Sequence, residues 1–219
     1  MEYAIKVENL SKKFGKEPVL RHVQADFEAG RIYGIVGRNG SGKTVLMKCI
    51  LGFLRPTEGS VSVFGKRIGQ DCDFAPETGM IIETPGFLLD ESGKNNLAWL
   101  LALSDRNTRR SRAERVSAVM RLVGLNPSNR KPVRHYSLGM RQRLGIAQAI
   151  LEQPRLLVLD EPMNGLDNQG VSEMRQLFLS LWDEGTTILL ASHNPLDITS
   201  LCDTVYEMDS GHLTRQPNF

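Results

Sequence analysis

Cysteine residues and long apolar runs are scarce in this chain of 219 residues. Its three cysteines, Cys49, Cys72 and Cys202, lie far apart, which excludes a disulfide framework and the paired spacing of a zinc site. The longest unbroken apolar run covers residues 97–103, whereas a membrane-spanning helix needs about 20 apolar residues. The first ten residues, MEYAIKVENL, lack the basic start and apolar stretch of a signal peptide. These absences predict a reduced, cytosolic chain without a membrane span of its own.

A strong net charge is also lacking. The formal net charge is +2, which is too small to demand nucleic acid or an acidic partner, and we expect no nucleic-acid partner. Residues 106–134 are the exception, because they contain nine Lys or Arg residues and a single acidic residue, Glu114. This basic cluster is either a solvated helix face or a surface that meets acidic lipid headgroups or an acidic partner loop.

Three short apolar runs indicate buried strands. They are IYGIV at 32–36, LLVL at 156–159 and ILLA at 188–191, and each is followed by polar or glycine residues and then by a helical pattern. This alternation predicts an α/β fold with a mostly parallel sheet and helices on both of its faces. Ligands bind such sheets at the carboxyl ends of the strands, where polar clusters stand in this sequence.

Two regions do not follow that alternation. Residues 4–7, 19–27 and 59–64 alternate like strands and predict a small N-terminal antiparallel β layer. Residues 94–124 have apolar residues at helical spacing. We therefore expect a single domain over residues 1–219. The β layer and the α/β core occupy 1–86 and 136–219, and a helical insertion that carries the basic cluster occupies 87–135.

Residues 37–44, GRNGSGKT, match the phosphate-loop pattern G-x-x-x-x-G-K-[ST] in full. Its glycines allow backbone N–H groups to surround phosphate oxygens, and a helix that begins near Lys43 directs its positive end at them. Lys43 is expected to reach the β and γ phosphates, and the Thr44 hydroxyl is expected to hold Mg²⁺. The motif alone does not separate a kinase, a GTPase and a transport ATPase, but the guanine-reading stretch N-K-x-D is absent. The expected nucleotide contacts here are Gly37, Arg38, Asn39, Gly40, Ser41, Gly42, Lys43, Thr44 and Val45.

Two carboxylates follow the predicted strand at 156–159, in the stretch LLVLDEP. A carboxylate at a strand end can hold Mg²⁺ or its water, and the next can align an attacking water or accept its proton. We assign Asp160 to the metal and Glu161 to the water.

The stretch YSLGMRQRL at 136–144 begins a further predicted helix, 138–151. Ser137 is placed as its N-cap, and Ser137 with Gly139 would make a second anion site at a helix start. The economical use of two such sites is a pair of chains arranged head to tail, each placing its serine end over the other's phosphate loop. The alternative is an ordinary capped helix with no ligand.

Six stretches occur in one order along the chain: Phe14, GRNGSGKT, IIETPGF, YSLGMRQRL, LLVLDEPMNGLD and Ser192-His193. In this combination the chain resembles the ATP-binding subunit of ABC transporters over nearly its whole length. The pattern SLGMRQR and the glutamate in IIETP are similar to the bacitracin-resistance and lantibiotic-immunity exporter branch. The resemblance implies a P-loop NTPase with a RecA-like core that binds ATP and Mg²⁺.

The resemblance also implies roles for single residues. Phe14 would stack on adenine. Ser137 and Gly139 would contact the γ-phosphate held by a second nucleotide-binding subunit, and Asp167 would lie in the loop that crosses the dimer interface. His193 would lie near the γ-phosphate as a catalytic residue. A polytopic membrane permease would dock on residues 83–89 and the helical insertion. The chain would then be peripheral on the inner face of the cell membrane, and the pair would be two copies of it or one copy and a homologue.

This chain departs from the family pattern at four positions. Glu83 stands where a glutamine usually ligates Mg²⁺, and its carboxylate can still do so. Val45 replaces a second hydroxyl residue, so one side-chain contact to phosphate would be missing. Met140 lacks the usual side-chain amide of the signature stretch. Met163 replaces a threonine, a change without a physical account at the level of sequence.

These observations favour an ATP-hydrolysing motor subunit of a transporter, and specifically an exporter of a peptide or antibiotic. One alternative is a soluble, ATP-switched ABC regulatory protein without a permease, although the tandem cassettes and long arms typical of that class are absent. A small-molecule kinase is a second alternative, but it leaves Ser137–Arg143 and Asp167 without a role.

Overall fold

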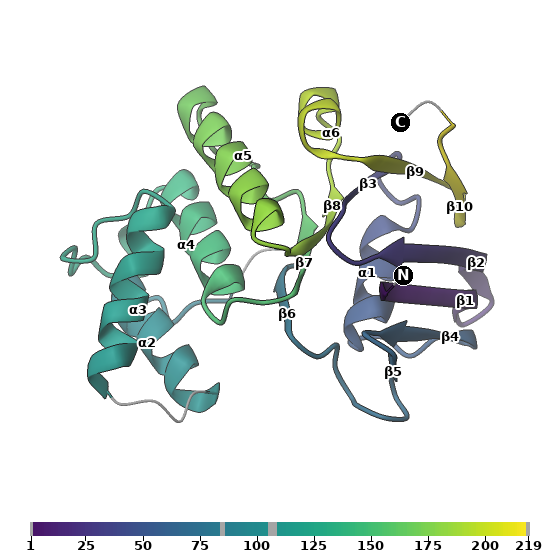
Figure 1. Ribbon diagram of the computed structural model, residues 1–219, viewed down its shortest axis with the longest axis horizontal. Coiled ribbons are helices and arrows are strands. Elements are labelled where there is room, and N and C mark those ends of the chain that lie inside the picture. Colours follow the sequence, from purple (N-terminus) through teal and green to yellow (C-terminus); the bar gives the residue numbers. More distant parts are fainter. Residues whose placement is uncertain (1, 84–85, 105–108, 218–219) are drawn as a thin grey trace.

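The computed structural model describes residues 2–83, 86–104 and 109–217 (Figure 1). Its centre is a six-stranded sheet with the order β10-β9-β3-β8-β7-β6. These strands are β3 (Ile32–Val36), β6 (Thr78–Ile81), β7 (Leu156–Asp160), β8 (Thr187–Ala191), β9 (Thr204–Asp209) and β10 (His212–Arg215). All neighbours pair in parallel except β9 and β10, so the predicted parallel sheet is confirmed.

A second, antiparallel sheet has the order β2-β1-β4-β5. It consists of β1 (Tyr3–Phe14), β2 (Glu17–Glu28), β4 (Glu58–Val63) and β5 (Lys66–Arg67). The predicted N-terminal β layer is therefore confirmed, and its first two strands are longer than the sequence pattern indicates. Asn9 and His22 have positive φ and lie at irregularities of the β1–β2 ladder, where the alternation of apolar and polar residues is broken.

Helices pack against one face of the central sheet. The antiparallel sheet, together with one helix, packs against the opposite face (Figure 1). Strand β7 explains this arrangement, because successive side chains point to opposite faces of a sheet. Leu157 and Leu159 are buried in the core that contains α4 and α5, whereas Leu156 and Val158 are buried in the core that contains β1, β2, β4 and α1. A strand buried on both faces reads as a continuous apolar run, which is why LLVL predicted it.

The helices are α1 (Lys43–Leu51), α2 (Gly93–Ser104), α3 (Arg109–Leu122), α4 (Leu138–Ile150), α5 (Asn168–Asp183) and α6 (Pro195–Leu201), with a 3-10 turn at Val133–His135. The predicted helical segment is thus two helices, α2 and α3, which pack on each other and on α4 through buried residues such as Leu97, Met120 and Leu144. The division of the domain at residues 86 and 136 stays a prediction. Within the described residues, no helix has the length and apolar character needed to cross a bilayer.

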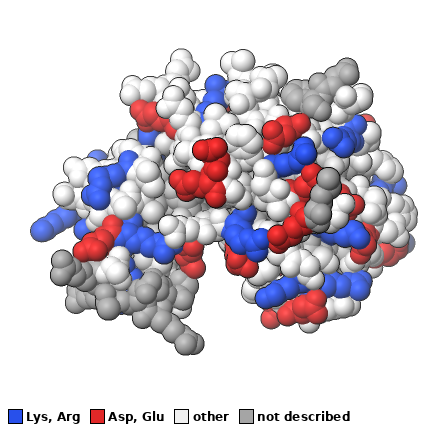
Figure 2. Space-filling model, in the orientation of Figure 1, with Lys and Arg blue, Asp and Glu red and all other residues white. Residues whose placement is uncertain are grey.

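The basic cluster contains residues whose charges are already engaged within the chain. The Arg115 Nε donates to the carbonyl of Leu151 at 2.5 Å, and Arg134 pairs with Asp90. Arg106 lies outside the described residues. On the face shown in Figure 2, outside the grey atoms, Lys and Arg side chains are interspersed with Asp and Glu rather than gathered in one patch.

Candidate functional site

The carboxyl ends of β3, β7 and β8 bring the predicted site residues to one edge of the central sheet. A pocket of about 890 Å³ lies there. Its lining includes Asn39, Gly40, Gly42, Lys43, Thr44, Val45, Glu83, Asp160 and Glu161. Residues from three separate stretches of the chain therefore share one cavity. Strands β3 and β7, which precede the first and the last of these stretches, are ones that the sequence predicts.

The phosphate loop depends on a backbone that only glycine adopts readily. Gly37 has φ 148° and Gly42 has φ 117°, both in the range that side chains disfavour. A Cβ on Gly37 would lie 2.2 Å from the Met208 carbonyl oxygen. Gly42 is the N-cap of α1, so the free N–H groups of the first turn of α1 face the loop.

Polar groups inside this loop are available to an anion. The Lys43 side chain is buried, and its Nζ donates to the carbonyl oxygens of Gly37 at 2.7 Å and Arg38 at 3.1 Å. The Ser41 Oγ is buried and forms no hydrogen bond with any described residue. A buried hydroxyl without a partner is uncommon and indicates a missing acceptor. The loop therefore has the charge and the free donor that a phosphate would satisfy.

Thr44 and Asp160 bring together the oxygen donors expected of a Mg²⁺ site. The Thr44 hydroxyl, in the first turn of α1, donates to the Asp160 Oδ2 at the end of β7 over 2.6 Å. No group of three His, Cys, Asp or Glu side chains suited to a metal occurs among the described residues. This donor set fits Mg²⁺ in nucleotide sites, where one or two carboxylates act together with waters and substrate phosphates.

Glu161 and His193 contact each other although they are 32 positions apart in the sequence. The His193 Nδ1 lies 2.8 Å from the Glu161 Oε1. Glu161 has φ 51°, and its N–H donates to the carbonyl of Ala191 at the end of β8. Its side chain is 22% exposed, whereas that of His193 is 64% exposed. The carboxylate is thus fixed at the pocket, and the imidazole reaches it from a more open loop.

Glu83 follows the edge strand β6 and lines the same pocket. Its Oε1 lies 2.6 Å from the Nζ of Lys48 on α1. The carboxylate is therefore held against the helix that starts at the phosphate loop. The sequence did not predict this partner. Thr84 and Pro85, in the segment predicted to meet a permease, lie outside the described residues.

Ser137 is the N-cap of α4, as predicted, and its Oγ accepts a hydrogen bond from the Met140 N–H at 3.2 Å. The start of α4 packs closely on the loop after β7, since a Cβ on Gly139 would lie 3.2 Å from the Gly165 carbonyl oxygen. Asp167 ends that loop as the N-cap of α5, and its Oδ1 accepts from the Gly170 N–H at 2.9 Å. These two predicted dimer elements are therefore neighbours within one chain.

The structure also shows the surroundings of two residues that the sequence analysis discussed and of one that it missed. Phe14, at the end of β1, is 48% exposed and has the Lys12 ammonium 5.1 Å from its ring centroid. Met163 is buried in the core shared with α4 and α5, which gives a physical reason for an apolar residue there. The sequence analysis missed Gln142, whose Nε2 donates to the Pro162 carbonyl at 2.6 Å and so ties α4 to the residue after Glu161.

Comparison with known proteins identifies the family. The model of the ABC transporter family matches residues 20–164. The chain belongs to the ABC transporter family. It is 42% identical over 220 residues to the bacitracin transport ATP-binding protein BcrA of Enterococcus faecalis, with 100% of this chain and 70% of that protein covered. It is 35% identical over 204 residues to the lantibiotic transport ATP-binding protein SrtF of Streptococcus pyogenes, with 92% and 85% covered.

Solved structures of ABC cassettes share the fold. A dimeric bacterial ABC transporter cassette has a TM-score of 0.88 at 22% identity, covering 98% of this chain and 100% of that one. The cassette cbiO1 of Clostridium perfringens, part of an ABC transporter complex, has a TM-score of 0.82 at 27% identity, covering 98% and 88%. The predicted P-loop NTPase fold and branch resemblance are confirmed. This ABC cassette is an ATP-binding and ATP-hydrolysing subunit of a transporter.

Proposed function

We propose that two copies of this ABC cassette bind two ATP molecules head to tail. Each nucleotide would lie between the phosphate loop of one subunit and the Ser137 end of α4 in the other. The observation that carries this proposal is that the chain has two helix starts suited to phosphate, at Lys43 and at Ser137. Because the Ser137 Oγ accepts from Met140, its O–H remains available to donate to a phosphate oxygen of the partner's nucleotide.

The phosphate loop would exchange internal contacts for contacts to ATP. The Lys43 ammonium would donate its hydrogen bonds to phosphate oxygens in place of the carbonyls of Gly37 and Arg38. The Ser41 hydroxyl, which has no partner among the described residues, would also donate to a phosphate oxygen. A charge-assisted bond to phosphate is stronger than one to a neutral carbonyl. Phe14 would stack on the adenine through its exposed ring, which selects weakly among bases.

Thr44 and Asp160 would hold Mg²⁺, and Glu83 would hold it directly or through a water after leaving Lys48. The ion would neutralise charge that develops on the β and γ phosphates. Val45, half-buried against the β-layer core, adds no oxygen donor to this set.

Glu161 would orient the attacking water and accept its proton, and His193 would contact the γ-phosphate while it retains the Glu161 carboxylate. Asp167 would reach toward the other subunit from the start of α5. Catalysis of phosphoryl transfer depends mainly on the positioning of the reactants and on electrostatic stabilisation, and these residues would supply both.

The transported substrate is proposed to be a peptide antibiotic that is exported, in line with the names of the bacitracin and lantibiotic relatives. A cytoplasmic helix of a polytopic membrane permease would dock near the loop after β6 and on α2. Leu88 and Leu89 are 54% and 51% exposed there, and Trp99 on α2 is 49% exposed. Such apolar side chains suit a helix-in-groove contact. The cassette would then be peripheral on the inner face of the cell membrane.

The test is a pull-down of tagged Glu161→Gln cassette from detergent-solubilised membranes of its own host, in ATP and Mg²⁺. Loss of the general base should trap the ATP-bound dimer, and a polytopic membrane protein should be recovered only with ATP. The matched control is Lys43→Ala, which should weaken ATP binding and abolish that dependence. Recovery of a dimer without any membrane protein would contradict the permease partner and turn the interpretation to a soluble regulatory ABC protein.

A further inference from the structure

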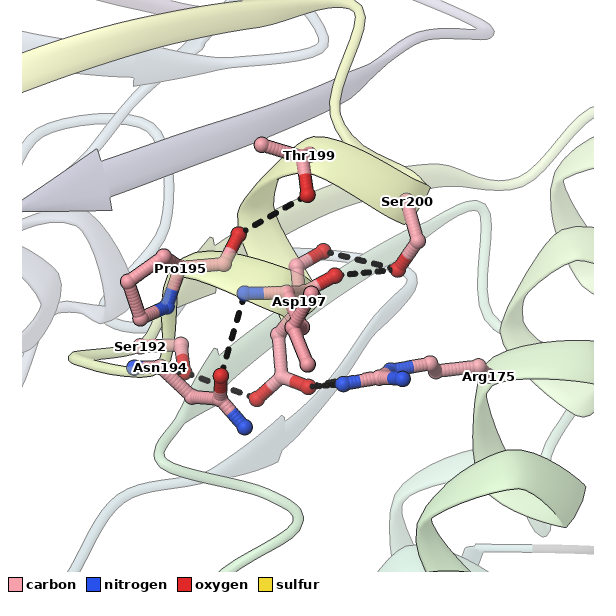
Figure 3. A network of polar contacts seen from close by, with 8 residues as sticks. Arg175, Ser192, Asn194, Pro195, Asp197, Thr199 and Ser200 are labelled. Carbon is pink, nitrogen blue, oxygen red and sulfur yellow. Dashed lines mark hydrogen bonds and ion pairs between the residues drawn. The ribbon is translucent and has the colours of Figure 1, made fainter.

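A buried polar network joins α5 to α6 (Figure 3) and includes Ser192 and Asn194, the two sequence neighbours of His193. At its centre is Asp197 on α6, which is 3% exposed. The Asp197 Oδ1 accepts from the Arg175 guanidinium of α5, at 3.0 Å from Nε and 2.5 Å from Nη2. The Asp197 Oδ2 accepts from the Ser192 hydroxyl at 2.9 Å. Both oxygens of this carboxylate are therefore committed to partners that fix its orientation.

Because the Asp197 carboxylate is buried, the network is sensitive to the loss of a charge or of a hydrogen-bond partner. A charged carboxylate away from water is costly unless it is paired and hydrogen-bonded. The Asp197 side chain is 4% exposed and that of Arg175 is 22% exposed. The loss of the Arg175 charge would leave a buried carboxylate without its counter-ion, and the loss of the Asp197 charge would leave a partly buried guanidinium without one. The network therefore has one arrangement that satisfies all its members.

Ser192 connects Asp197 to the backbone of the loop that carries His193. Its hydroxyl donates to Asp197 and also accepts from the Asn194 N–H at 3.1 Å, which closes a turn around His193. The Asn194 Oδ1 then caps α6 by accepting from the Leu196 N–H at 3.0 Å. The backbone is held on both sides of His193, although the imidazole itself is largely exposed.

We propose that Asp197 and Arg175 are positioning residues, which act through Ser192 to hold the His193 ring against Glu161. The proposal rests on the proposed role of His193 in ATP hydrolysis. An exposed loop imidazole would otherwise sample several rotamers and lose its 2.8 Å contact with Glu161. A misplacement of about 1 Å at a reacting group can lower turnover by about a hundredfold.

The first experiment observes the His193 ring in the nucleotide-free cassette. The chain has four histidines, so their ring C–H signals can be resolved by NMR, and His193→Ala identifies the signal of His193. Asp197→Asn and Ser192→Ala should each shift and broaden that signal. Ser192→Ala leaves the buried ion pair intact, so it covers the case in which Asp197→Asn folds poorly. The matched control is Ser200→Ala, because among the described residues the Ser200 hydroxyl donates to carbonyls of α6 alone.

The second experiment is a double-mutant cycle on steady-state ATPase turnover. Asp197→Asn should lower kcat by about 10- to 100-fold while the affinity for ATP stays unchanged. In the His193→Ala background the same substitution should have almost no further effect, because its action passes through the ring. A structural defect would lower turnover equally in both backgrounds, and that result would overturn the proposal.

The two experiments separate failure of this proposal from failure of the proposed function. Normal turnover of His193→Ala would remove the catalytic role of His193, while the NMR comparison would still decide whether Asp197 holds the ring. An unchanged His193 signal in both Asp197→Asn and Ser192→Ala would refute the positioning role, whatever His193 does in catalysis.

Discussion

Replacement of Gly37 by alanine should destabilise the nucleotide-free cassette far more than the same change at Gly40. Gly37 has φ 148°, and its new Cβ would lie 2.2 Å from the backbone carbonyl oxygen of Met208 in β9. That oxygen cannot move without displacing a strand of the central sheet. A positive φ costs alanine about 1–2 kcal/mol, and overpacking adds about 1–3 kcal/mol. We expect Gly37→Ala to lose about 2–5 kcal/mol of unfolding free energy.

Gly40 provides the matched control within the same loop. It has φ 79°, but nothing lies within 4 Å of an added Cβ, so Gly40→Ala should lose only about 1–2 kcal/mol. The free energy of unfolding is measured by urea titration without nucleotide, using circular dichroism. Equal losses in the two variants would refute the argument, because they would mean that the carbonyl of Met208 does not restrict the loop.

Three further predictions concern the site and the cysteines. Glu161→Gln should lower turnover by about 10²–10⁴-fold, as for loss of a general base, while fluorescent ATP analogues still bind; near-normal phosphate release would refute that role. Glu83→Gln should raise the Mg²⁺ concentration for half-maximal ATPase activity by about fivefold, equivalent to roughly 1 kcal/mol for one screened charge; an unchanged midpoint would contradict a metal contact. Burial raises the pKa of Cys49 to about 11 and that of Cys202 to about 12. Cys49 is buried, whereas Cys202 and Cys72 are both half-buried. Since only the thiolate reacts, Cys49 and Cys202 should label with iodoacetamide at pH 8 more slowly than Cys72, and equal rates in the native protein would show that the raised pKa does not protect them.

In the central sheet, the strands that the sequence predicted are those whose residues are buried on both faces. IYGIV, LLVL and ILLA are short continuous apolar runs, which the centre of a parallel sheet requires. The edge strand β6 was not predicted, because its sequence is TGMI and Gly79 has no side chain. A Cβ at Gly79 would lie 1.9 Å from the Ala149 carbonyl, so α4 approaches β6 too closely for any other residue. The alternating pattern of β9 was readable and was missed.

In the site, the residues that could be predicted belong to local sequence patterns, and those that could not depend on contacts between distant segments. The phosphate loop, the carboxylates after β7 and the cap at Ser137 are local patterns, so their residues could be named from the sequence. Contacts between distant segments could not be named. Lys48 pairs with Glu83 across 35 positions, and Arg175 pairs with Asp197 across 22. Such pairs depend on how helices pack on the sheet, and spacing along the chain carries no record of that packing.

Helix α5 connects three parts of the site through contacts of this distant kind. It begins at its N-cap Asp167, pairs with α4 through Glu173 and Arg143 at 2.7 Å, and pairs with α6 through Arg175. The hydrogen bond from Arg143 lowers the pKa of Glu173, which keeps that carboxylate ionised. Glu173 and Arg175 are two positions apart and so face opposite sides of the helix.

A helix that is fastened on both sides moves its neighbours when it moves. Arg143 strengthens the connection to α4, because its Nη1 also donates to the Val123 carbonyl at the end of α3. If dimer closure displaced Asp167, α5 would pull on the Ser137 helix through Arg143 and on the His193 loop through Arg175. Dimer closure and the placement of the His193 ring would then be one mechanical event. The conformational step would thus set the geometry of hydrolysis, as lid and loop closures do in other enzymes.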